Sequence, residues 1–206
     1  MDEKRRQILD EILKLAAFEG WNDKSLERAA QNAGFEAKYA YVLFPEGIKS
    51  LTSYFAKSCD TEMEKNLGNA KLNELRIRDR IAEAVMTRLR IYDKNKEAIR
   101  TLIAYYALPE NSLRSMKNIA RTVDKMWYAA GDNSNDYNYY TKRLLLSGVY
   151  TSTILYWLND DSKDLSATKE FLKRRIEDVM QFQKMKSKAK ELSEKLKNAI
   201  PFKKAI

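Results

Sequence analysis

The side chains that most often perform acid–base or metal chemistry are nearly missing from this chain. Its 206 residues include no histidine and one cysteine, Cys59. Histidine is the usual general base near neutral pH, and zinc sites normally need several Cys or His ligands. No Gly-rich phosphate loop and no nucleophile–base set is evident either. We therefore expect no catalytic residue, no metal site and no cofactor, and a protein that is not an enzyme, with Cys59 acting as a small buried hydrophobe.

The charge of the chain is concentrated at its C-terminal end. The net charge is +9, yet residues 1–50 hold eight Lys or Arg and nine Asp or Glu. Residues 184–206 hold eight Lys and two Glu. The basic character of the chain therefore lies at its C-terminal end.

Apolar residues recur at helical spacing along most of the chain, while Gly and Pro are scarce. This pattern predicts an all-α fold without strands. Inward faces should include Leu75, Ile81, Val85 and Leu89 in one helix, and Leu113, Met116, Ile119 and Val123 in another. We expect helices from the N-terminus to residue 19 and over residues 25–33, 36–43, 48–67, 72–92, 96–107, 112–130, 136–158 and 165–183, with turns at 44–47, 131–135 and 160–162.

Residues 25–34 (SLERAAQNAG) and 41–44 (YVLF) resemble the DNA-binding signature of TetR-type helix-turn-helix proteins, in which an Ala-Gly turn precedes a helix ending in Tyr-x-x-Phe. Phosphate binding needs clustered basic residues. Here opposite charges balance: Lys24, Arg28, Lys38 and Lys49 against Asp23, Glu27, Glu36 and Glu46. We expect a retained scaffold over residues 1–50 that binds no nucleic acid. A TetR-type ligand-responsive transcription repressor is the alternative.

A second resemblance covers nearly the whole chain. Residues 126–143 (MWYAAGDNSNDYNYYTKR) resemble a signature of the coenzyme Q (ubiquinone) biosynthesis accessory family, the ninth protein of the yeast series. In that family Met-Trp-x-Tyr-Ala-Gly-Asp leads into Asp-aromatic-Asn-Trp-Tyr-Thr-Arg-Arg. Supporting matches lie at residues 77–90 and 107–111, and the Lys-rich tail is also a family feature.

The resemblance implies a homodimeric TetR-like protein whose larger helical bundle, over residues 51–183, binds lipid. It would hold isoprenoid quinone precursors or phospholipid in a hydrophobic cavity and present them to the demethoxyubiquinone hydroxylase, performing no chemistry itself. The N-terminus carries no secretory apolar region and is too acidic for a mitochondrial presequence, and no stretch reaches about 20 apolar residues. We expect a cytoplasmic protein, peripheral on the inner membrane face.

Long helices could enclose such a cavity. Small residues in the middle of the 136–158 helix, at 147, 148, 151 and 152, would permit either close helix contact or cavity space. Candidate lining residues, each of which could instead be an ordinary core residue, are Val85, Leu89, Leu102, Tyr105, Met116, Ile119, Leu144, Tyr150 and Ile154.

Aromatic residues crowd around the loop at 131–135. Exposed aromatic side chains together with Arg commonly anchor protein interfaces. Alternatively, Trp127 and Tyr140 belong to the core and Asp136 caps a helix. Position-by-position matching to the family's partner-binding patch gives Met126, Asp136, Tyr139, Tyr140 and Arg143, with Tyr139 where the family often has Trp.

The tail predicts a basic amphipathic helix over residues 184–206. Apolar residues from Met185 to Ile200 form one stripe, and lysines occupy the remaining surface. Such a helix lies in a membrane interface; alternatives are packing on its own domain, a frayed terminus or a nucleic-acid arm. The expected membrane-binding residues are Met185, Lys188, Leu192, Lys195, Leu196, Ile200 and Phe202.

Overall fold

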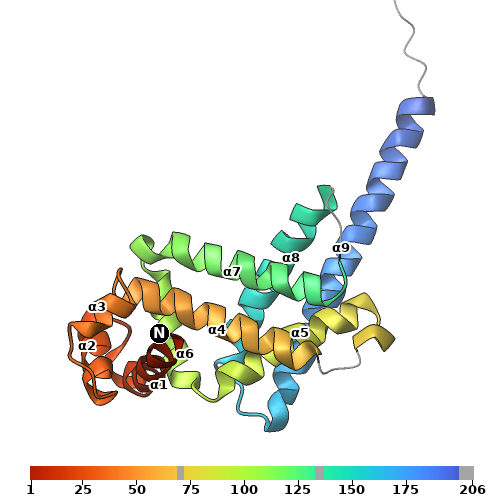
Figure 1. Cartoon of the computed structure of the whole chain (residues 1–206). Helices are drawn as coiled ribbons and strands as arrows, with labels where there is room; N and C mark the ends of the chain where they lie inside the picture. The colour runs from red at the N-terminus through yellow and green to blue at the C-terminus, as the bar shows by residue number, and fades with distance from the viewer. Residues whose placement is uncertain (69–71, 133–136, 200–206) are drawn as a thin grey trace, which may run out of the picture.

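The computed structural model describes residues 1–68, 72–132 and 137–199, and within these ranges all regular structure is helical (Figure 1). The all-α prediction is therefore confirmed. The elements are α1 (Asp2–Glu19), α2 (Asp23–Asn32), α3 (Tyr39–Leu43), α4 (Ile48–Gly68), η1 (Leu72–Glu74), α5 (Ile77–Asp93), α6 (Lys96–Ala107), α7 (Pro109–Ala129), α8 (Tyr137–Trp157), η2 (Lys163–Leu165) and α9 (Ser166–Ala199).

The N-terminal unit consists of α1, α2 and α3. Asn22 and Ser25 form a reciprocal capping box that fixes the start of α2. Gly34 follows α2 with φ 81°, a left-handed conformation that glycine adopts without steric cost. The helix expected over 36–43 becomes α-helical only at Tyr39, because the backbone bonds just before it close three-residue turns, such as Tyr39 N–H to the Glu36 carbonyl.

This unit is anchored on the larger helical body through α6. The Trp21 indole donates a hydrogen bond to the Ala98 carbonyl at 2.9 Å. The Thr101 hydroxyl donates to the Ala16 carbonyl at 2.8 Å. Both links bridge segments far apart in sequence, so the helix-turn-helix unit and the body share packed surface.

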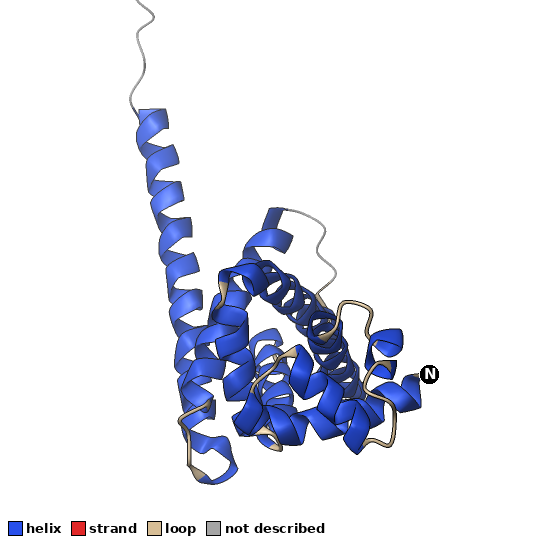
Figure 2. Cartoon of the chain, turned by 90° about the vertical axis from the view of Figure 1, so that its left-hand side faces the viewer, coloured by secondary structure: helices blue, strands red, loops and turns tan. Residues whose placement is uncertain are grey.

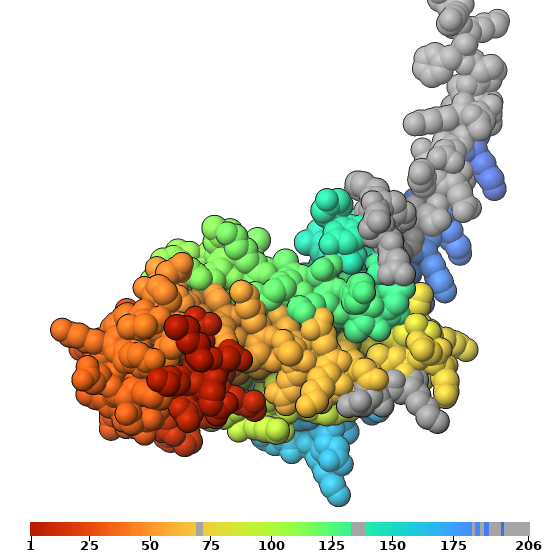
Figure 3. Space-filling model, viewed as in Figure 1, coloured from red at the N-terminus to blue at the C-terminus, as the bar shows by residue number. Residues whose placement is uncertain are grey.

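In the larger body, α4 and α7 lie side by side, as Figures 1 and 3 show, and α8 packs on α7. The α9 helix contacts α8 and α5. Burial of large apolar side chains between these helices is the main favourable contribution to the stability of the fold. The core includes Leu51, Phe55, Met63, Val85, Leu89, Val123 and Trp157.

Two predicted inward faces differ from the structure. Leu75 precedes α5, which begins only at Ile77 after an extended residue, and its side chain is exposed. On α7, the buried face carries Asn118 and Thr122 beside Val123, while Leu113 and Met116 point to solvent. The reason is a polar cluster under α7, described below, which turns this polar side of the helix inward.

A single helix, α9, runs from Ser166 to Ala199 and crosses the expected division at 183/184 without a break. Its start is fixed by Asp160, which accepts hydrogen bonds from the backbone N–H groups of Ser162 and Thr168, both at 2.8 Å. Thirty-four residues make a helix roughly 51 Å long. Figure 2 shows its C-terminal part projecting away from the other helices.

Candidate functional site

A cavity of about 280 Å³ lies between α4, α5, α6, α7 and α8. This volume is close to the lower end of small-molecule pockets, roughly 300–1,000 Å³. Most of its wall is apolar, and it could therefore shelter a hydrocarbon or ring system. The wall is formed by Phe55, Ala56, Arg88, Tyr92, Ile99, Leu102, Ile103, Tyr106, Ala107, Ser115, Asn118, Ile119, Thr122, Tyr150, Thr151, Ile154 and Leu155.

The cavity wall runs from exposed to fully buried residues. Ala107, Thr151 and Leu155 are exposed, and they form its outer rim. At the other extreme, Arg88 and Tyr150 are buried. The rim is therefore small or apolar, whereas the buried end carries a charge and hydroxyl groups.

An ionic cluster centred on Asp60 of α4 lies behind the buried end of the cavity wall, to which Arg88 and Thr122 belong. Asp60 Oδ1 lies 2.9 Å from Arg88 Nη1 and accepts a hydrogen bond from the Thr122 hydroxyl at 2.7 Å. Its Oδ2 accepts a hydrogen bond from Arg121 Nε at 2.8 Å. Asp60 and Arg88 are essentially inaccessible to solvent, and a buried ion pair of this kind needs such additional hydrogen bonds to offset desolvation.

This cluster provides hydrogen-bond acceptors for only some of the N–H groups of Arg88. Its Nη2 donates to the Ala56 carbonyl and to the Tyr92 hydroxyl, both at 3.1 Å. Its Nε and Nη1 complete no hydrogen bond. Burial, the largest influence, raises the pKa of Tyr150 well above its ordinary value, so the neighbouring phenol stays neutral.

The Cys59 thiol also lies beside this cluster. Burial is the main cause that raises its pKa to about 11. The thiol therefore remains protonated near neutral pH, and the reactive thiolate is scarce. This agrees with a packing role for Cys59.

The nine candidate lining residues divide into three groups in the structure. Leu102, Ile119, Tyr150 and Ile154 line the cavity. Val85 and Leu89 are fully buried core residues outside its wall, and Tyr105 is half-buried beside it. Met116 and Leu144 are 67% and 73% exposed and also lie outside the wall, because the helical faces that carry them point to solvent.

Neither Asp60 nor Arg88 is among the residues that periodicity and motif spacing single out. A signal is nevertheless present in the sequence. Arg88 lies three residues after Val85, on the inward stripe of its helix, and Asp60 occupies the buried face of α4. A charge of each sign at an inward position is the pattern expected of a buried ion pair.

The aromatic segment around the 131–135 loop forms its own network. Arg143 Nε donates to Asp124 Oδ1 at 2.7 Å, and Arg143 Nη1 lies 3.3 Å from Asp132 Oδ2. The guanidinium lies 3.4 Å from the centre of the Tyr139 ring. The Tyr139 hydroxyl donates to the same Asp124 oxygen at 3.0 Å. Arg143 and Tyr139 therefore make extensive contacts within the chain.

The remaining partner-binding candidates lie in different environments. Met126 is fully buried, so its side chain is inaccessible to a partner in the folded chain. Asp136 lies outside the described residues. Tyr140 is 75% exposed, which excludes the alternative that it belongs to the core. Trp127 is half-buried, and its indole donates to the Lys142 carbonyl.

One face of α8 is exposed along its length. Its members follow each other at spacings of four, four, three and four residues, so they share one side of the helix. We call this face the α8 stripe: Tyr140, Leu144, Gly148, Thr151 and Leu155.

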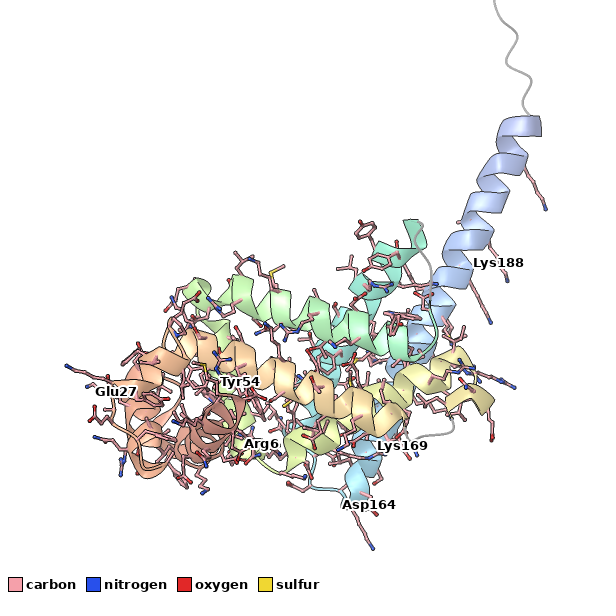
Figure 4. All side chains as sticks on the ribbon, in the orientation of Figure 1. Arg6, Glu27, Tyr54, Asp164, Lys169 and Lys188 are labelled. Atoms are coloured by element: carbon pink, nitrogen blue, oxygen red, sulfur yellow. The ribbon has the colours of Figure 1, made fainter. Side chains whose placement is uncertain are left out.

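The tail candidates that the structure describes lie on the projecting part of α9. Met185, Lys188 and Lys195 are exposed, and Lys188 points away from the other helices in Figure 4. Leu192 and Leu196 belong to the helix, but their side chains are not among those described. Ile200 and Phe202 lie outside the described residues. Across the described ranges, no helix is long and apolar enough to cross a membrane, and no group of three potential metal ligands occurs.

The N-terminal helix-turn-helix unit followed by a larger helical body defines a TetR-like fold. The solved TetR transcriptional regulator of Nitrosomonas europaea is similar with a TM-score of 0.70, and the match covers 85% of this chain and 97% of that one. Sequence identity is 21%, so the likeness concerns the fold alone.

Sequence comparison connects the chain to one group within this fold. The COQ9 family model matches residues 113–183. The chain is 29% identical over 195 residues to the probable ubiquinone biosynthesis protein coq9, mitochondrial, of Dictyostelium discoideum, with 92% of this chain and 64% of that protein covered. It is 30% identical over 186 residues to ubiquinone biosynthesis protein COQ9, mitochondrial, of Homo sapiens, with 87% and 58% covered.

The resemblance to the coenzyme Q biosynthesis accessory family is therefore confirmed, because the chain is similar in sequence to the COQ9 proteins. It spans about 58–64% of the length of these relatives. The segment that matches the family model contains α7 from Leu113, α8 and the first half of α9. It thus includes the part of the cavity wall that α7 and α8 form, with the rim residues Thr151 and Leu155, and the whole α8 stripe.

Proposed function

We propose that this chain is a non-enzymatic lipid-binding accessory protein of ubiquinone biosynthesis. The names of its relatives support the pathway. The observation that carries lipid binding is the largely apolar cavity whose rim, at Thr151 and Leu155, reaches the surface. Leu102, Ile119 and Ile154 supply apolar wall against an isoprenoid quinone precursor or an acyl chain. Since the cavity is small, the far part of a long chain would remain outside it.

The projecting half of α9 supports peripheral attachment to the inner membrane face. Exposed Lys188 and Lys195, with Met185 beside them, offer charge and apolar surface to anionic lipid. Each Lys near such a surface contributes on the order of 1 kcal/mol. Attachment of this strength is reversible, which suits a carrier that must load and release.

The α8 stripe is the surface proposed for protein partners. Tyr140 and Leu144 are large, exposed and apolar, and they lie next to the Arg143–Asp124 network that holds the start of α8 in place. This surface would receive either a second copy of the chain, forming a homodimer, or the demethoxyubiquinone hydroxylase to which the lipid is presented. Exposed apolar patches commonly mark such contacts.

The helix-turn-helix unit is proposed as scaffold without DNA binding. In HTH proteins the second helix enters the major groove, yet here α3 has five residues. The hydroxyl of Tyr41, a residue of α3, donates to Glu27 of α2 at 2.7 Å, and this hydrogen bond is the main cause that raises the pKa of Tyr41 to about 12. The negative charge of Glu27 next to α3 would repel the phosphates of DNA. The geometry of this unit therefore favours the scaffold role over a transcription repressor.

Lipid extraction of the purified protein tests the proposal. Native mass spectrometry should show a bound phospholipid or quinone-like lipid in the wild type. Ile119→Trp, which places a large ring in the cavity wall, should lower the lipid-bound fraction at least severalfold. Leu113→Trp is the matched control, because the same change on the exposed side of the same helix leaves the cavity open. A wild-type protein that carries no lipid, before or after incubation with membranes, would refute the proposal.

A further inference from the structure

We infer that the cavity takes its ligand head-inward, with an oxygen acceptor of the polar head held by Arg88. This inference rests on the proposed lipid binding and adds its recognition chemistry. The ligand class is an amphiphile whose ring or head carries carbonyl or similar acceptor oxygens and whose apolar part extends toward the rim at Thr151 and Leu155.

The first support is an unused donor beside the cavity. The Arg88 guanidinium has five N–H donors. Nη2 has two acceptors, but Nε has none, and Nη1 lies near Asp60 without completing a hydrogen bond. Buried donors are rarely left unpaired, because desolvation without a partner is costly. A ligand oxygen next to Arg88 would remove this cost.

The second support is the charge balance of the buried end. Asp60 is shared by Arg88 and Arg121, so the three groups carry one positive charge in excess. Further along α4, Glu62 is exposed to solvent, and Glu64 is already paired with Lys125 at 2.6 Å. In a region shielded from water, this excess charge favours an electron-rich atom more strongly than it would in solvent.

The third support is that the other buried polar wall groups already have hydrogen-bond partners. The Thr122 hydroxyl donates to Asp60, and the Asn118 amide donates to the Tyr106 hydroxyl at 3.0 Å. Tyr150 and Tyr92 line the cavity with Arg88, and the Tyr92 hydroxyl accepts a hydrogen bond from Arg88 Nη2. Among the buried wall residues that the structure describes, Arg88 is therefore the one with unpaired N–H groups. The apolar wall from Ile99 to Ile154 is then available to the apolar part of the ligand.

A pair of ligands that differ by one carbonyl isolates this contact. Octanophenone and octylbenzene share ring and chain, and only the ketone offers an oxygen acceptor. Calorimetric titration of the full chain gives the ratio of their affinities. Arg88→Met should lower the ketone-to-hydrocarbon ratio by about tenfold or more, with octylbenzene binding retained, because charge-assisted hydrogen bonds are strong. Arg88→Lys, which keeps a charged donor, should give an intermediate ratio.

Arg121→Met is the matched control. It removes the other arginine from the same Asp60 carboxylate, but Arg121 does not line the cavity. The ketone preference should therefore fall much less in this variant than in Arg88→Met, because the direct donor to the ligand remains and only the excess charge is removed. An equal loss of preference in both variants, or no loss in Arg88→Met, would overturn the inference. If the wild type binds neither ligand, the proposed lipid binding itself fails.

Infrared spectroscopy of the wild type gives a test that does not depend on any variant. The carbonyl stretch of bound octanophenone should lie at lower wavenumber than in hexane, since a hydrogen bond weakens the C=O bond. A bound ketone with the hexane frequency would also overturn the inference.

Discussion

The Asp160 carboxylate links the end of α8 to the start of α9. Burial by itself raises its pKa, but hydrogen bonds from Ser162 and Thr168 outweigh burial and lower the pKa from 3.8 to about 2. A carboxyl whose pKa is lower in the folded than in the unfolded chain stabilises the fold above the unfolded pKa. That contribution is lost as the pH falls through the folded pKa, in this case between about 4 and 2.

Asp160→Ala should lower the free energy of unfolding near neutral pH by about 1–2 kcal/mol, the usual contribution of a helix cap. The difference from the wild type should shrink as the pH falls from 4 toward 2, because the wild-type carboxylate is then protonated. Urea unfolding followed by circular dichroism measures both effects. Asp161→Ala, at the exposed neighbouring position, is the control and should change little. A wild-type advantage that stays constant down to pH 2.5 would contradict the assigned role.

Single residues were the hardest level to predict from the sequence. Periodicity places Arg88 and Asp60 on inward faces, but a charge in a sequence pattern is normally read as solvated. Only the fold brings Arg88, Asp60 and Arg121 within ion-pair distance. Motif matching had the same limit at Met126, because a shared motif does not state whether a side chain packs inward.

Among the elements, α9 makes the most direct prediction. Lys188→Glu combined with Lys195→Glu should weaken binding to phosphatidylserine vesicles by about 30-fold or more, from on the order of 1 kcal/mol per lysine. Vesicle flotation measures this binding, and pure phosphatidylcholine vesicles should show little of it.

Lys169→Glu with Lys173→Glu is the matched control for α9. It makes the same charge change on the same helix, but in the part that packs on the body, where Figure 4 shows Lys169. This variant should float with vesicles much as the wild type does. Equal losses in both variants would indicate a general charge effect and contradict a dedicated membrane contact at the projecting end.

The sequence predicts the existence of most helices, but it predicts less well which side of each helix is buried. Spacing and Gly34 defined α1, α2 and the long helices within a few residues. The inward side of α7 is predicted only in part: Val123 is buried and Ile119 lines the cavity, as expected, but Leu113 is exposed and the polar residues Asn118 and Thr122 are buried. A hydrophobicity pattern assumes that the apolar side is buried, and a buried polar network reverses that assumption.

At the scale of the whole molecule, the α8 stripe predicts self-association. Leu144→Glu should shift the protein toward monomer in analytical ultracentrifugation, with the dissociation constant raised about tenfold or more, because a charge would be buried in an apolar contact. Phe18→Glu is the matched control, since Phe18 is 93% exposed but lies on α1 in the N-terminal unit. A wild type that is monomeric throughout would contradict this use of the stripe.

The fold class was accessible from composition and motifs, whereas the cavity was not. Scarce Gly and Pro, helical spacing and the residues around Gly34 together indicated an all-α, TetR-like chain. Whether five helices leave a hollow between them depends on tertiary packing, to which Phe55, Leu102 and Ile154 contribute from different segments. Four of the nine candidate wall residues do line it, because inward faces of neighbouring helices are where a hollow must form.

The continuity of α9 has a mechanical consequence. Residues 166–199 contain neither glycine nor proline, the residue types at which helices most often bend. The N-terminal part of α9 packs on the helical body, where the rings of Phe171 and of Tyr156 in α8 stack with their centroids 4.3 Å apart. A partner or membrane that binds the C-terminal turns of α9 therefore also determines the orientation of the helical body, and with it the direction in which the cavity opening at Thr151 and Leu155 faces.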